Sequence, residues 1–294
     1  MELRLLATFE KVADVLSFTR AAAELGYAQS SVTSQVRALE SSLGVDLFER
    51  LGSRIRLTEA GERLLPYARR MADLADEART AVAATAEPSG PIAVGTMESL
   101  TSYRLPPLLE YFHHRYPKVR LTLRPTLGDE TRQALRQGTY DVGFLMEPET
   151  EHEGLESEVL APEPLVLVAG PHHPLTSRTD LTNAALAGTQ LLGTEPGCTY
   201  RDLFEAELRE WAPPFMEFGT IEATKRGVAA GLGVALLPRV TVEEELASGT
   251  LVELAWKAPF TLFTQLAWRR GKRLPAHVRL FVEQARRLVS EQRG

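Results

Sequence analysis

Small polar side chains occupy one face of a segment near the N-terminus. Apolar residues recur there at helical spacing and predict a helix over about 28–43 with one buried stripe, made of Val32, Val36, Leu39 and Leu43. The opposite face carries hydroxyls, one amide and one guanidinium, on Gln29, Ser30, Ser31, Thr33, Ser34 and Arg37. Such a face suits hydrogen bonding to base edges and phosphates in a major groove. Arg37 could read guanine in a bidentate manner, and its alternative role is a phosphate contact.

A preceding helix must position this face. Residues 18–25 predict a short helix, with Ser17 as its N-cap and Gly26 as its stop. A further amphipathic helix is expected before it, from Leu3 to Leu16. Two short helices separated by a glycine turn are typical of a helix-turn-helix.

Arginines also flank a Gly-Ser turn just beyond this unit. Alternation over 54–57 predicts a small hairpin, or wing, that would set Arg50 and Arg54 against phosphates or a minor groove. The alternative is a solvated arginine loop. Residues 1–60 contain seven basic and eight acidic residues, and the whole chain has a net charge of −6, so any positive surface must be local.

The next segment, residues 58–86, has a helical pattern that ends at the breaker 87–91. Its apolar positions alternate at spacings of four and three, as in a heptad seam, at Leu64, Ala68, Met71, Ala75, Ala78 and Val82. This pattern favours a dimerising linker helix, and the alternative is an ordinary core stripe. Beyond residue 91, short apolar strands alternate with helices, which predicts an α/β architecture with mostly parallel sheets.

The length of 294 residues predicts two or more domains, and the apolar and charged fractions of 44% and 24% exclude disordered, collagen-like and disulfide-framework classes. No run approaches the ~18 apolar residues of a spanning helix, and the N-terminus lacks a signal-peptide pattern. The single cysteine, Cys198, cannot form an intramolecular disulfide, which fits a reducing compartment. We therefore expect a cytoplasmic protein.

The N-terminal sequence is similar to the DNA-binding signature of LysR-type transcriptional regulators of bacteria. The similarity runs through residues 9–13, 17–22, 29–36, 47–50 and 57–61. Later segments match the effector-binding domain of that family more loosely, among them 173–175 and 227–238. The resemblance implies an α+β multi-domain fold, with an N-terminal winged helix-turn-helix, a long linker helix and a C-terminal periplasmic-binding-protein-like effector domain of two subdomains.

The resemblance also implies domain boundaries. They are 1–57 for the winged helix-turn-helix, 58–87 for the linker helix, 88–91 for a hinge and 92–294 for the effector domain. Within the last, subdomain I is expected at 92–161 and 267–294, and subdomain II at 162–266. The implied function is sequence-specific DNA binding controlled by a small-molecule effector in the cleft. The implied partners are double-stranded DNA with a partly palindromic promoter site, a second copy through the linker helix, a homotetramer built from such dimers, and RNA polymerase.

Loops that follow strands supply the candidate effector-binding residues, because ligands of α/β domains bind at the carboxyl ends of strands. From the first subdomain these are Thr96, Glu98, Ser99, Leu100, Gly128, Phe144 and Met146. From the second they are Thr194, Glu195, Gly197, Cys198, Thr199, Glu222 and Thr224. Helix N-termini there favour an anion, whereas the three acids favour a cation or amine, so the charge of the effector stays open.

The sequence gives little support for redox sensing, metal binding, catalysis or solute transport. A redox role for Cys198 lacks a resolving thiol, so a structural or ligand-lining role is favoured. The pairs His113-His114 and His172-His173 are adjacent and do not have metal-ligand spacing. No nucleophile elbow, phosphate loop or complete dinucleotide fingerprint is present, so neither an enzyme nor a cofactor is expected. A transport-type solute receptor would need export.

Overall fold

A computed structural model describes residues 2–51, 54–82 and 87–291 of the chain. The chain divides into an N-terminal unit through residue 86 and a C-terminal unit from Glu87 onward, the short segments 137–139 and 273–276 aside. Within the described ranges, no helix combines the length and the apolar character needed to cross a bilayer.

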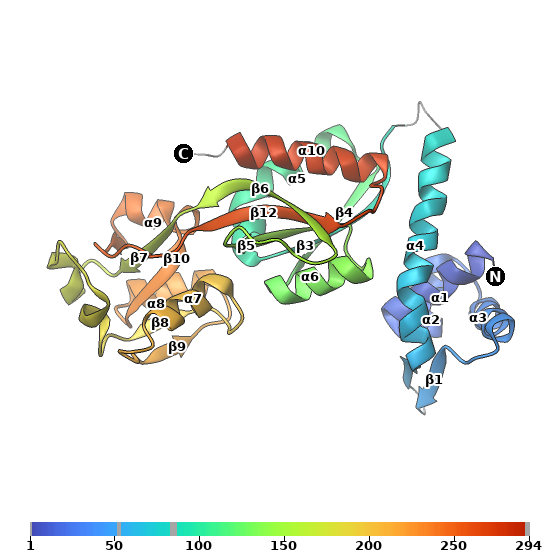
Figure 1. Ribbon diagram of the computed structural model, residues 1–294, viewed down its shortest axis with the longest axis horizontal. Coiled ribbons are helices and arrows are strands. Elements are labelled where there is room, and N and C mark those ends of the chain that lie inside the picture. The colour runs from blue at the N-terminus through green and yellow to red at the C-terminus, as the bar shows by residue number, and fades with distance from the viewer. Residues whose placement is uncertain (1, 52–53, 83–86, 292–294) are drawn as a thin grey trace. The chain divides into compact units, whose positions relative to one another are not determined.

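The N-terminal unit is a winged helix-turn-helix followed by a long helix (Figure 1). Its elements are α1 (Leu3–Val15), α2 (Phe18–Leu25), α3 (Gln29–Leu43), β1 (Phe48–Leu51), β2 (Arg54–Leu57) and α4 (Glu59–Val82). The Ser17 hydroxyl caps α2 by accepting a hydrogen bond from the Arg20 amide at 3.3 Å. Gly26 ends that helix with a φ of 68°, a left-handed conformation that glycine adopts without steric cost.

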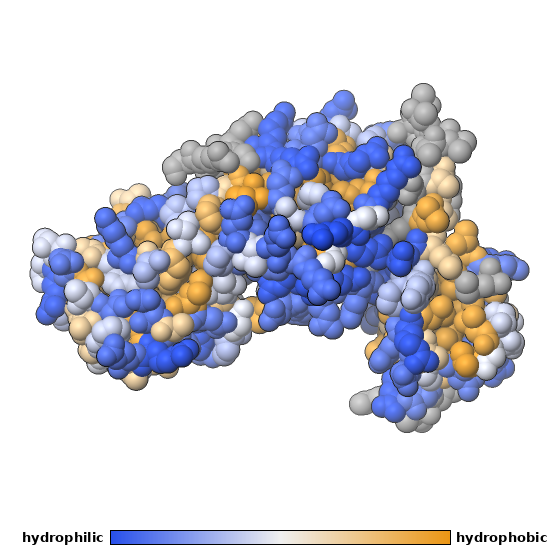
Figure 2. Space-filling model, viewed as in Figure 1, coloured by the Kyte–Doolittle hydropathy of each residue, from blue (hydrophilic) through white to orange (hydrophobic). Residues whose placement is uncertain are grey.

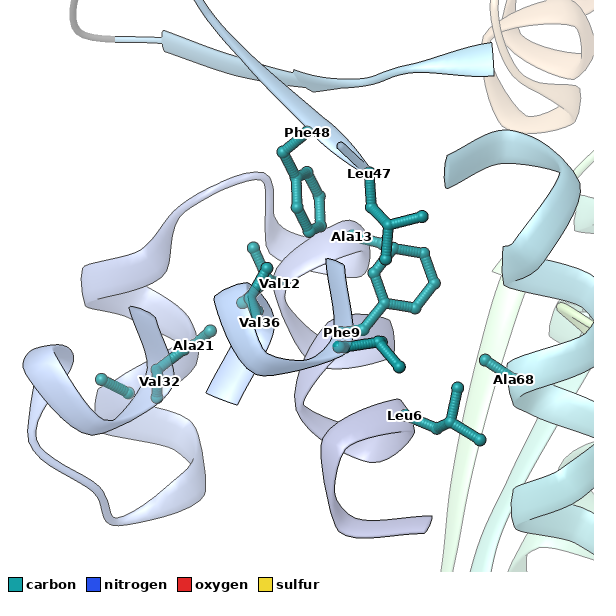
Figure 3. Packing of buried hydrophobic residues seen from close by; sticks show 12 residues of the cluster. Leu6, Phe9, Val12, Ala13, Ala21, Val32, Val36, Leu47, Phe48 and Ala68 are labelled. Atoms are coloured by element: carbon teal, nitrogen blue, oxygen red, sulfur yellow. The ribbon is translucent and has the colours of Figure 1, made fainter. Parts of the chain in front are cut away.

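Apolar side chains from the three short helices and the hairpin form one core (Figure 3). Phe9 of α1 is fully buried and packs against Phe48 of β1, with ring centroids 5.5 Å apart. The predicted stripe of α3 is buried at Val32, Val36 and Leu39. Its fourth predicted member, Leu43, is 39% exposed, because it is the last residue of the helix and lies outside this core. This packing fixes which face of α3 remains available to a partner.

The stripe predicted on α4 for dimerisation is, in its first half, part of this core. Ala68 is fully buried, and Leu64 and Met71 pack against the cluster. Among the α4 side chains that the structure describes, the exposed large apolar ones are instead Tyr67 and Leu74, with 57% and 63% of their surfaces accessible. The alternative of a core stripe therefore holds for this half of the pattern. Figure 2 shows apolar surface exposed on the N-terminal unit.

The C-terminal unit contains two five-stranded sheets. The first has the order β4-β3-β5-β12-β6. Its strands are β3 (Gly90–Thr96), β4 (Val119–Pro125), β5 (Val142–Glu147), β6 (Leu155–Glu163) and β12 (Leu262–Arg269). Helices α5 (Pro106–Arg115) and α10 (Ala276–Glu291) cover one face and α6 (Gly128–Gln137) covers the other (Figure 1). A π-helix, η1 (Leu100–Arg104), precedes α5.

The second sheet has the order β11-β7-β10-β8-β9. Its strands are β7 (Leu165–Ala169), β8 (Leu191–Gly193), β9 (Phe215–Glu217), β10 (Val234–Pro238) and β11 (Val252–Glu253). Its helices are α7 (Thr199–Glu207), α8 (Ile221–Ala229) and α9 (Glu243–Ser248), with 3-10 turns η2 (Pro174–Ser177), η3 (Asn183–Leu186) and η4 (Arg239–Thr241). A side chain at Gly233 would place its Cβ 2.1 Å from the Gln190 carbonyl oxygen, so this glycine permits a close backbone approach.

Three further details differ from the sequence-based expectations. The expected hinge, 88–91, overlaps the first sheet, because β3 already begins at Gly90. The expected subdomain limits, 161/162 and 266/267, fall inside β6 and β12, which both belong to the first sheet. Strand continuity instead places the crossings after Glu163 and before Leu262. The sheets are also mixed, because β12 runs antiparallel to β5 and β6 and β7 runs antiparallel to β10.

Candidate DNA-binding face and ligand cavity

Helix α3 presents the predicted polar residues on one side. Gln29, Ser30, Ser31, Ser34 and Arg37 are exposed, while the apolar stripe on the other side is buried. Thr33 is half-buried, and its hydroxyl donates to the Gln29 carbonyl oxygen at 3.0 Å. All six side chains are thus gathered on α3, and their contact with DNA stays a prediction.

The N-terminus of α3 differs from that of α2. Its N-cap, Ala28, makes no side-chain capping bond, and the first turn contains no acidic residue. The first amides of α3 therefore keep their hydrogen-bonding capacity and the positive end of the helix dipole. A phosphate group is a suitable partner for such an end.

The predicted wing is present as the antiparallel hairpin β1–β2. The backbones of Arg50 and Arg54 lie in its two strands, and their side chains lie outside the described part of the chain. Arg56 is neutralised by an ion pair with Glu49 directly across the strands.

Two further residues belong to this region. Glu40 of α3 accepts hydrogen bonds from the backbone amides of Leu47 and Phe48, at 2.9 and 3.3 Å, and so attaches the start of the hairpin to α3. Tyr27 is exposed in the turn just before α3. Its place between a helix-ending glycine and α3 is the sequence signal that would have identified it.

A cavity of about 560 Å³ lies in the C-terminal unit, where loops of the two sheets meet. This volume is within the range of about 300–1,000 Å³ that is typical of small-molecule sites. Its lining comes from residues 97–99 after β3, 125–128 at the end of β4 and the start of α6, 194–195 and 197–200 after β8, and 219–221 at the start of α8, with Glu130 of α6 and Met146 of β5. The cavity thus lies at the carboxyl ends of strands, where such folds bind ligands.

Nine of the fourteen candidate effector-binding residues line this cavity. They are Glu98, Ser99, Gly128, Met146, Thr194, Glu195, Gly197, Cys198 and Thr199. Nine further residues, which were not predicted from the sequence, also line it: Met97, Pro125, Thr126, Leu127, Glu130, Tyr200, Gly219, Thr220 and Ile221. Thr220 could have been found, because its hydroxyl caps α8 by accepting from the Ala223 amide at 3.1 Å.

The other five candidates are outside the lining of the cavity. Thr96 and Leu100 are fully buried and do not line it. Phe144 lies deeper in β5 and packs edge-on against Phe281 of α10. Thr224 donates its hydroxyl hydrogen to the Thr220 carbonyl oxygen at 3.0 Å. Glu222 forms ion pairs with Lys225 and Arg226 on its own helix. The order of strands and loops does not fix the direction of a side chain, so the sequence could not separate these five residues from those that line the cavity.

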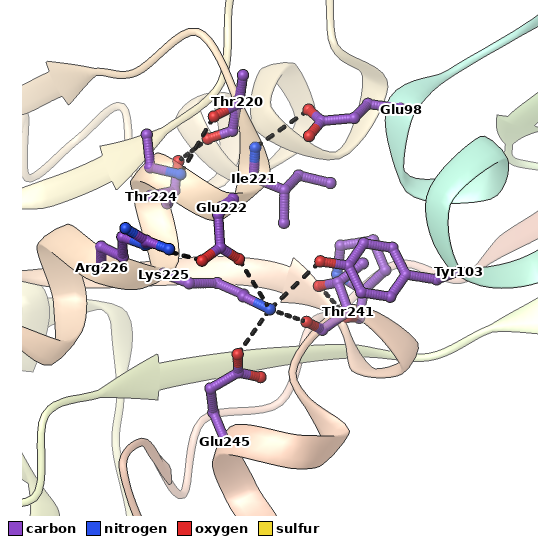
Figure 4. A network of polar contacts seen from close by, with 12 residues as sticks. Glu98, Tyr103, Thr220, Ile221, Glu222, Thr224, Lys225, Arg226, Thr241 and Glu245 are labelled. Atoms are coloured by element: carbon purple, nitrogen blue, oxygen red, sulfur yellow. Dashed lines mark hydrogen bonds and ion pairs between the residues drawn. The ribbon is translucent and has the colours of Figure 1, made fainter.

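Polar contacts join elements of the two subdomains (Figure 4). The Glu98 carboxylate reaches from the loop after β3 to the Ile221 amide at the start of α8, with Oε2 and N 3.1 Å apart. Lys225 of α8 donates to the Tyr103 hydroxyl of η1 at 3.2 Å and pairs with Glu245 at 2.6 Å. Burial alone would lower the pKa of Lys225, but these partners outweigh burial and raise it, so the side chain is charged at neutral pH.

Residues 3–62 match the model of the family described as "Bacterial regulatory helix-turn-helix protein, lysR family", and residues 85–290 match that of the "LysR substrate binding domain". This chain belongs to the LysR family of transcriptional regulators. The predicted family, fold class and regulatory function are confirmed, as is the expectation of a regulator rather than an enzyme.

Similar LysR-family proteins align with this chain over nearly its whole length. An uncharacterized HTH-type transcriptional regulator of Bacillus subtilis, YwqM, is 39% identical over 98% of this chain and 99% of its own. The structure of a full-length OxyR variant from Pseudomonas aeruginosa is similar, with 26% identity, a TM-score of 0.80, and coverage of 98% of this chain and 94% of that one. Full-length CbnR complexed with its target DNA matches with 26% identity and a TM-score of 0.62, over 98% of this chain and 99% of that one.

The thiol in the cavity of this LysR-family regulator is not activated. Burial raises the pKa of Cys198, so less thiolate is present at neutral pH than on a free cysteine. The described residues also contain no group of three His, Cys, Asp or Glu side chains placed to hold a metal ion.

Proposed function

We propose that this regulator binds a partly palindromic DNA site through the exposed face of α3 and the β1–β2 wing, and that a small molecule in the cavity controls the binding. The observation that carries the proposal is the uncapped α3, whose polar face is free while its apolar face is buried in the core. The predicted DNA contacts are Gln29, Ser30, Ser31, Thr33, Ser34, Arg37, Arg50 and Arg54. The protein acts in the cytoplasm, where its DNA is, and without a cofactor.

The cavity supports effector control because loops from both sheets line it. A ligand that contacts both can favour one arrangement of the two subdomains over another, and only such a difference in affinity can shift the equilibrium between them. The cavity-lining candidates are therefore the effector-binding residues of this proposal.

Assembly is part of the proposal. Exposed Tyr67 and Leu74 lie seven residues apart on α4, so they face the same side of the helix and provide an apolar strip for a second copy. Dimers formed through α4 associate into a homotetramer, and RNA polymerase is the further partner at the promoter. The family resemblance supports both steps.

Nuclease footprinting on the DNA that flanks the protein's own gene tests DNA recognition. Wild-type protein should protect a discrete region, and Arg37→Ala should weaken it by about 1–3 kcal/mol, or roughly fivefold to more than a hundredfold, since a lost bidentate base contact costs that much. Arg209→Ala, a change at an exposed arginine of the second subdomain, should leave the footprint unchanged. Equal, salt-sensitive binding to all DNA by wild type and Arg37→Ala would contradict specific recognition.

Effector control is tested by filling the cavity. Thr199→Trp places an indole at the start of α7, where the cavity is lined. A screen of small molecules should find compounds that raise the melting temperature of the wild type, but not of Thr199→Trp, and that alter the footprint only of the wild type. Compounds that act equally on both proteins would place effector control elsewhere.

A further inference from the structure

The charges in the cavity have one sign. Glu98, Glu130 and Glu195 are its charged lining residues, and the lining contains no lysine, arginine or histidine. Glu98 is half-buried, and Glu130 and Glu195 are exposed at the rim. None of the three carboxylates forms an ion pair among the residues that the structure describes. The cavity therefore has an unbalanced negative charge.

The N-termini of α6, α7 and α8 at the cavity do not reverse this sign, because the chain supplies each of the three with an acid. The Ile221 amide of α8 already donates to Glu98. At α7, the Asp202 carboxylate accepts from the Gly197 amide at 3.1 Å. Asp129 and Glu130 lie in the first turn of α6. The attraction that these helix ends would offer an anionic ligand is thus already satisfied internally.

Basic residues near the cavity are likewise paired. Arg201 of α7 forms ion pairs with Glu205 at 2.8 Å and Glu217 at 3.1 Å. Lys225 of α8 pairs with Glu245 and, at 3.4 Å, with Glu222. Neither residue belongs to the lining, so neither offers its charge to a ligand.

A second, independent feature indicates a missing polar partner. Thr194 lines the cavity and is only 4% exposed, and its hydroxyl oxygen is buried without a hydrogen-bond partner. The side chains of Cys198 and Tyr200 are close enough to interact with this hydroxyl, but neither makes a hydrogen bond of normal geometry to it. A buried polar atom of this kind is costly unless a bound group completes its hydrogen bond. The rest of the lining includes apolar side chains, at Met97, Leu127, Met146 and Ile221.

We propose that the cavity takes a small organic cation, in which a protonated amine is held by Glu98 and its acidic neighbours while an apolar body contacts the methionine and aliphatic side chains. An ammonium group has three donors and no acceptor, so carboxylate and hydroxyl oxygens such as those of Glu98 and Thr194 are the partners it needs. This inference rests on the proposed role of the cavity as the effector site and specifies the charge of its ligand.

Three probes with one carbon skeleton test the charge preference: 4-phenylbutylamine, 4-phenylbutan-1-ol and 4-phenylbutanoate. Binding to the full-length protein is measured by isothermal titration calorimetry at pH 7. The amine should bind at least about tenfold more tightly than the alcohol, because a charge-assisted hydrogen bond in a partly buried site is worth that much. The carboxylate should bind more weakly than the alcohol, since it meets like charge.

Variants identify the groups responsible. Glu98→Gln keeps an oxygen that can accept from the Ile221 amide but removes the charge, so amine affinity should fall about tenfold while alcohol affinity stays the same. Glu210→Gln removes the same charge from an exposed position outside the lining and should change neither. Thr199→Trp should abolish binding of the amine, which shows that the probe occupies the cavity.

Several outcomes would overturn the inference. They are equal binding of amine and alcohol, tighter binding of the carboxylate, an unchanged amine affinity in Glu98→Gln, or binding of none of the three probes. Each leaves the footprint comparison of wild type with Arg37→Ala as an independent result. If the wild type gives a specific footprint but does not prefer the amine, only the cationic ligand is rejected. If the wild type gives no specific footprint and does not prefer the amine, the regulatory proposal is rejected as well.

Discussion

Arg104 and Glu163 form an ion pair in which both side chains are nearly inaccessible to water, at 8% and 0% exposed. The guanidinium donates through Nε and Nη2 to the two carboxylate oxygens, both at 2.9 Å, and the Thr264 hydroxyl donates to Oε2 at 2.9 Å. Glu163 ends β6, at the point where the chain leaves the first sheet. The pair therefore links η1 to both strands that carry the chain between the subdomains.

Removing one member should be costly. Arg104→Met leaves the Glu163 carboxylate buried without its counter-charge, and we expect the C-terminal unit to lose about 3–5 kcal/mol of unfolding free energy. Urea denaturation followed by circular dichroism measures this loss. The double variant Arg104→Met/Glu163→Leu should recover part of it, because an apolar pair leaves no buried charge.

A surface pair provides the matched control. Arg286 and Glu158 are 48% and 35% exposed, so Arg286→Met should cost less than about 1 kcal/mol. Equal losses from Arg104→Met and Arg286→Met would show that the buried pair contributes no more than a solvated one.

At the scale of elements, periodicity and turn chemistry predicted the helix-turn-helix closely. The N-cap Ser17 and the stop at Gly26 are as expected, and so are three of the four stripe positions of α3, because these features depend on local sequence. The stripe on α4 shows the limit. Heptad spacing at Leu64, Ala68 and Met71 identifies a face that must be covered, but not whether the domain's own core or a second chain covers it. The exposure of Tyr67 and Leu74 depends on which side of α4 this core covers, so the spacing alone does not predict it.

The sequence predicted where the cavity lies, but only part of its lining. Strand ends located the loops, and nine residues from those loops line it. What the sequence could not supply was the direction of individual side chains, which depends on tertiary packing. Glu222 was expected to face the ligand, yet it pairs with Lys225 and Arg226. The unpartnered hydroxyl of Thr194 is likewise a property of three-dimensional packing and not of spacing.

The exposed strip of α4 leads to a prediction about assembly. Leu74→Lys introduces a charge at an exposed apolar position, which would have to be desolvated in a helix pair, so the dimer should dissociate at concentrations where wild type is associated. Analytical ultracentrifugation of the full-length protein reports the mass. Leu74→Met keeps the apolar surface and should associate like wild type. Identical masses for Leu74→Lys and wild type would remove α4 residue 74 from the interface.

At the scale of the whole molecule, a signal from the cavity must change the arrangement of the two subdomains, and two of the described side chains make polar contacts between them. The Glu98 carboxylate spans from the first sheet to the start of α8, and the Lys225 ammonium spans from α8 to Tyr103. Of the two, only Glu98 lines the cavity. A ligand that engages its carboxylate therefore competes with, or reinforces, a bond between the subdomains, which gives the ligand the differential interaction that a conformational shift requires.

Hydrogen exchange at α8 tests this link. In Glu98→Ala, the Ile221 amide loses its acceptor, so exchange in a peptide covering residues 219–225 should accelerate, by about tenfold or more if the bond limits local opening. In Glu98→Gln the amide oxygen replaces the carboxylate as acceptor, and exchange should remain near that of wild type. If the contact also sets the state that DNA senses, Glu98→Ala alters the footprint without any ligand while Glu98→Gln does not. Faster exchange with an unchanged footprint would mean that the bond orders α8 only locally and that the signal passes through other contacts.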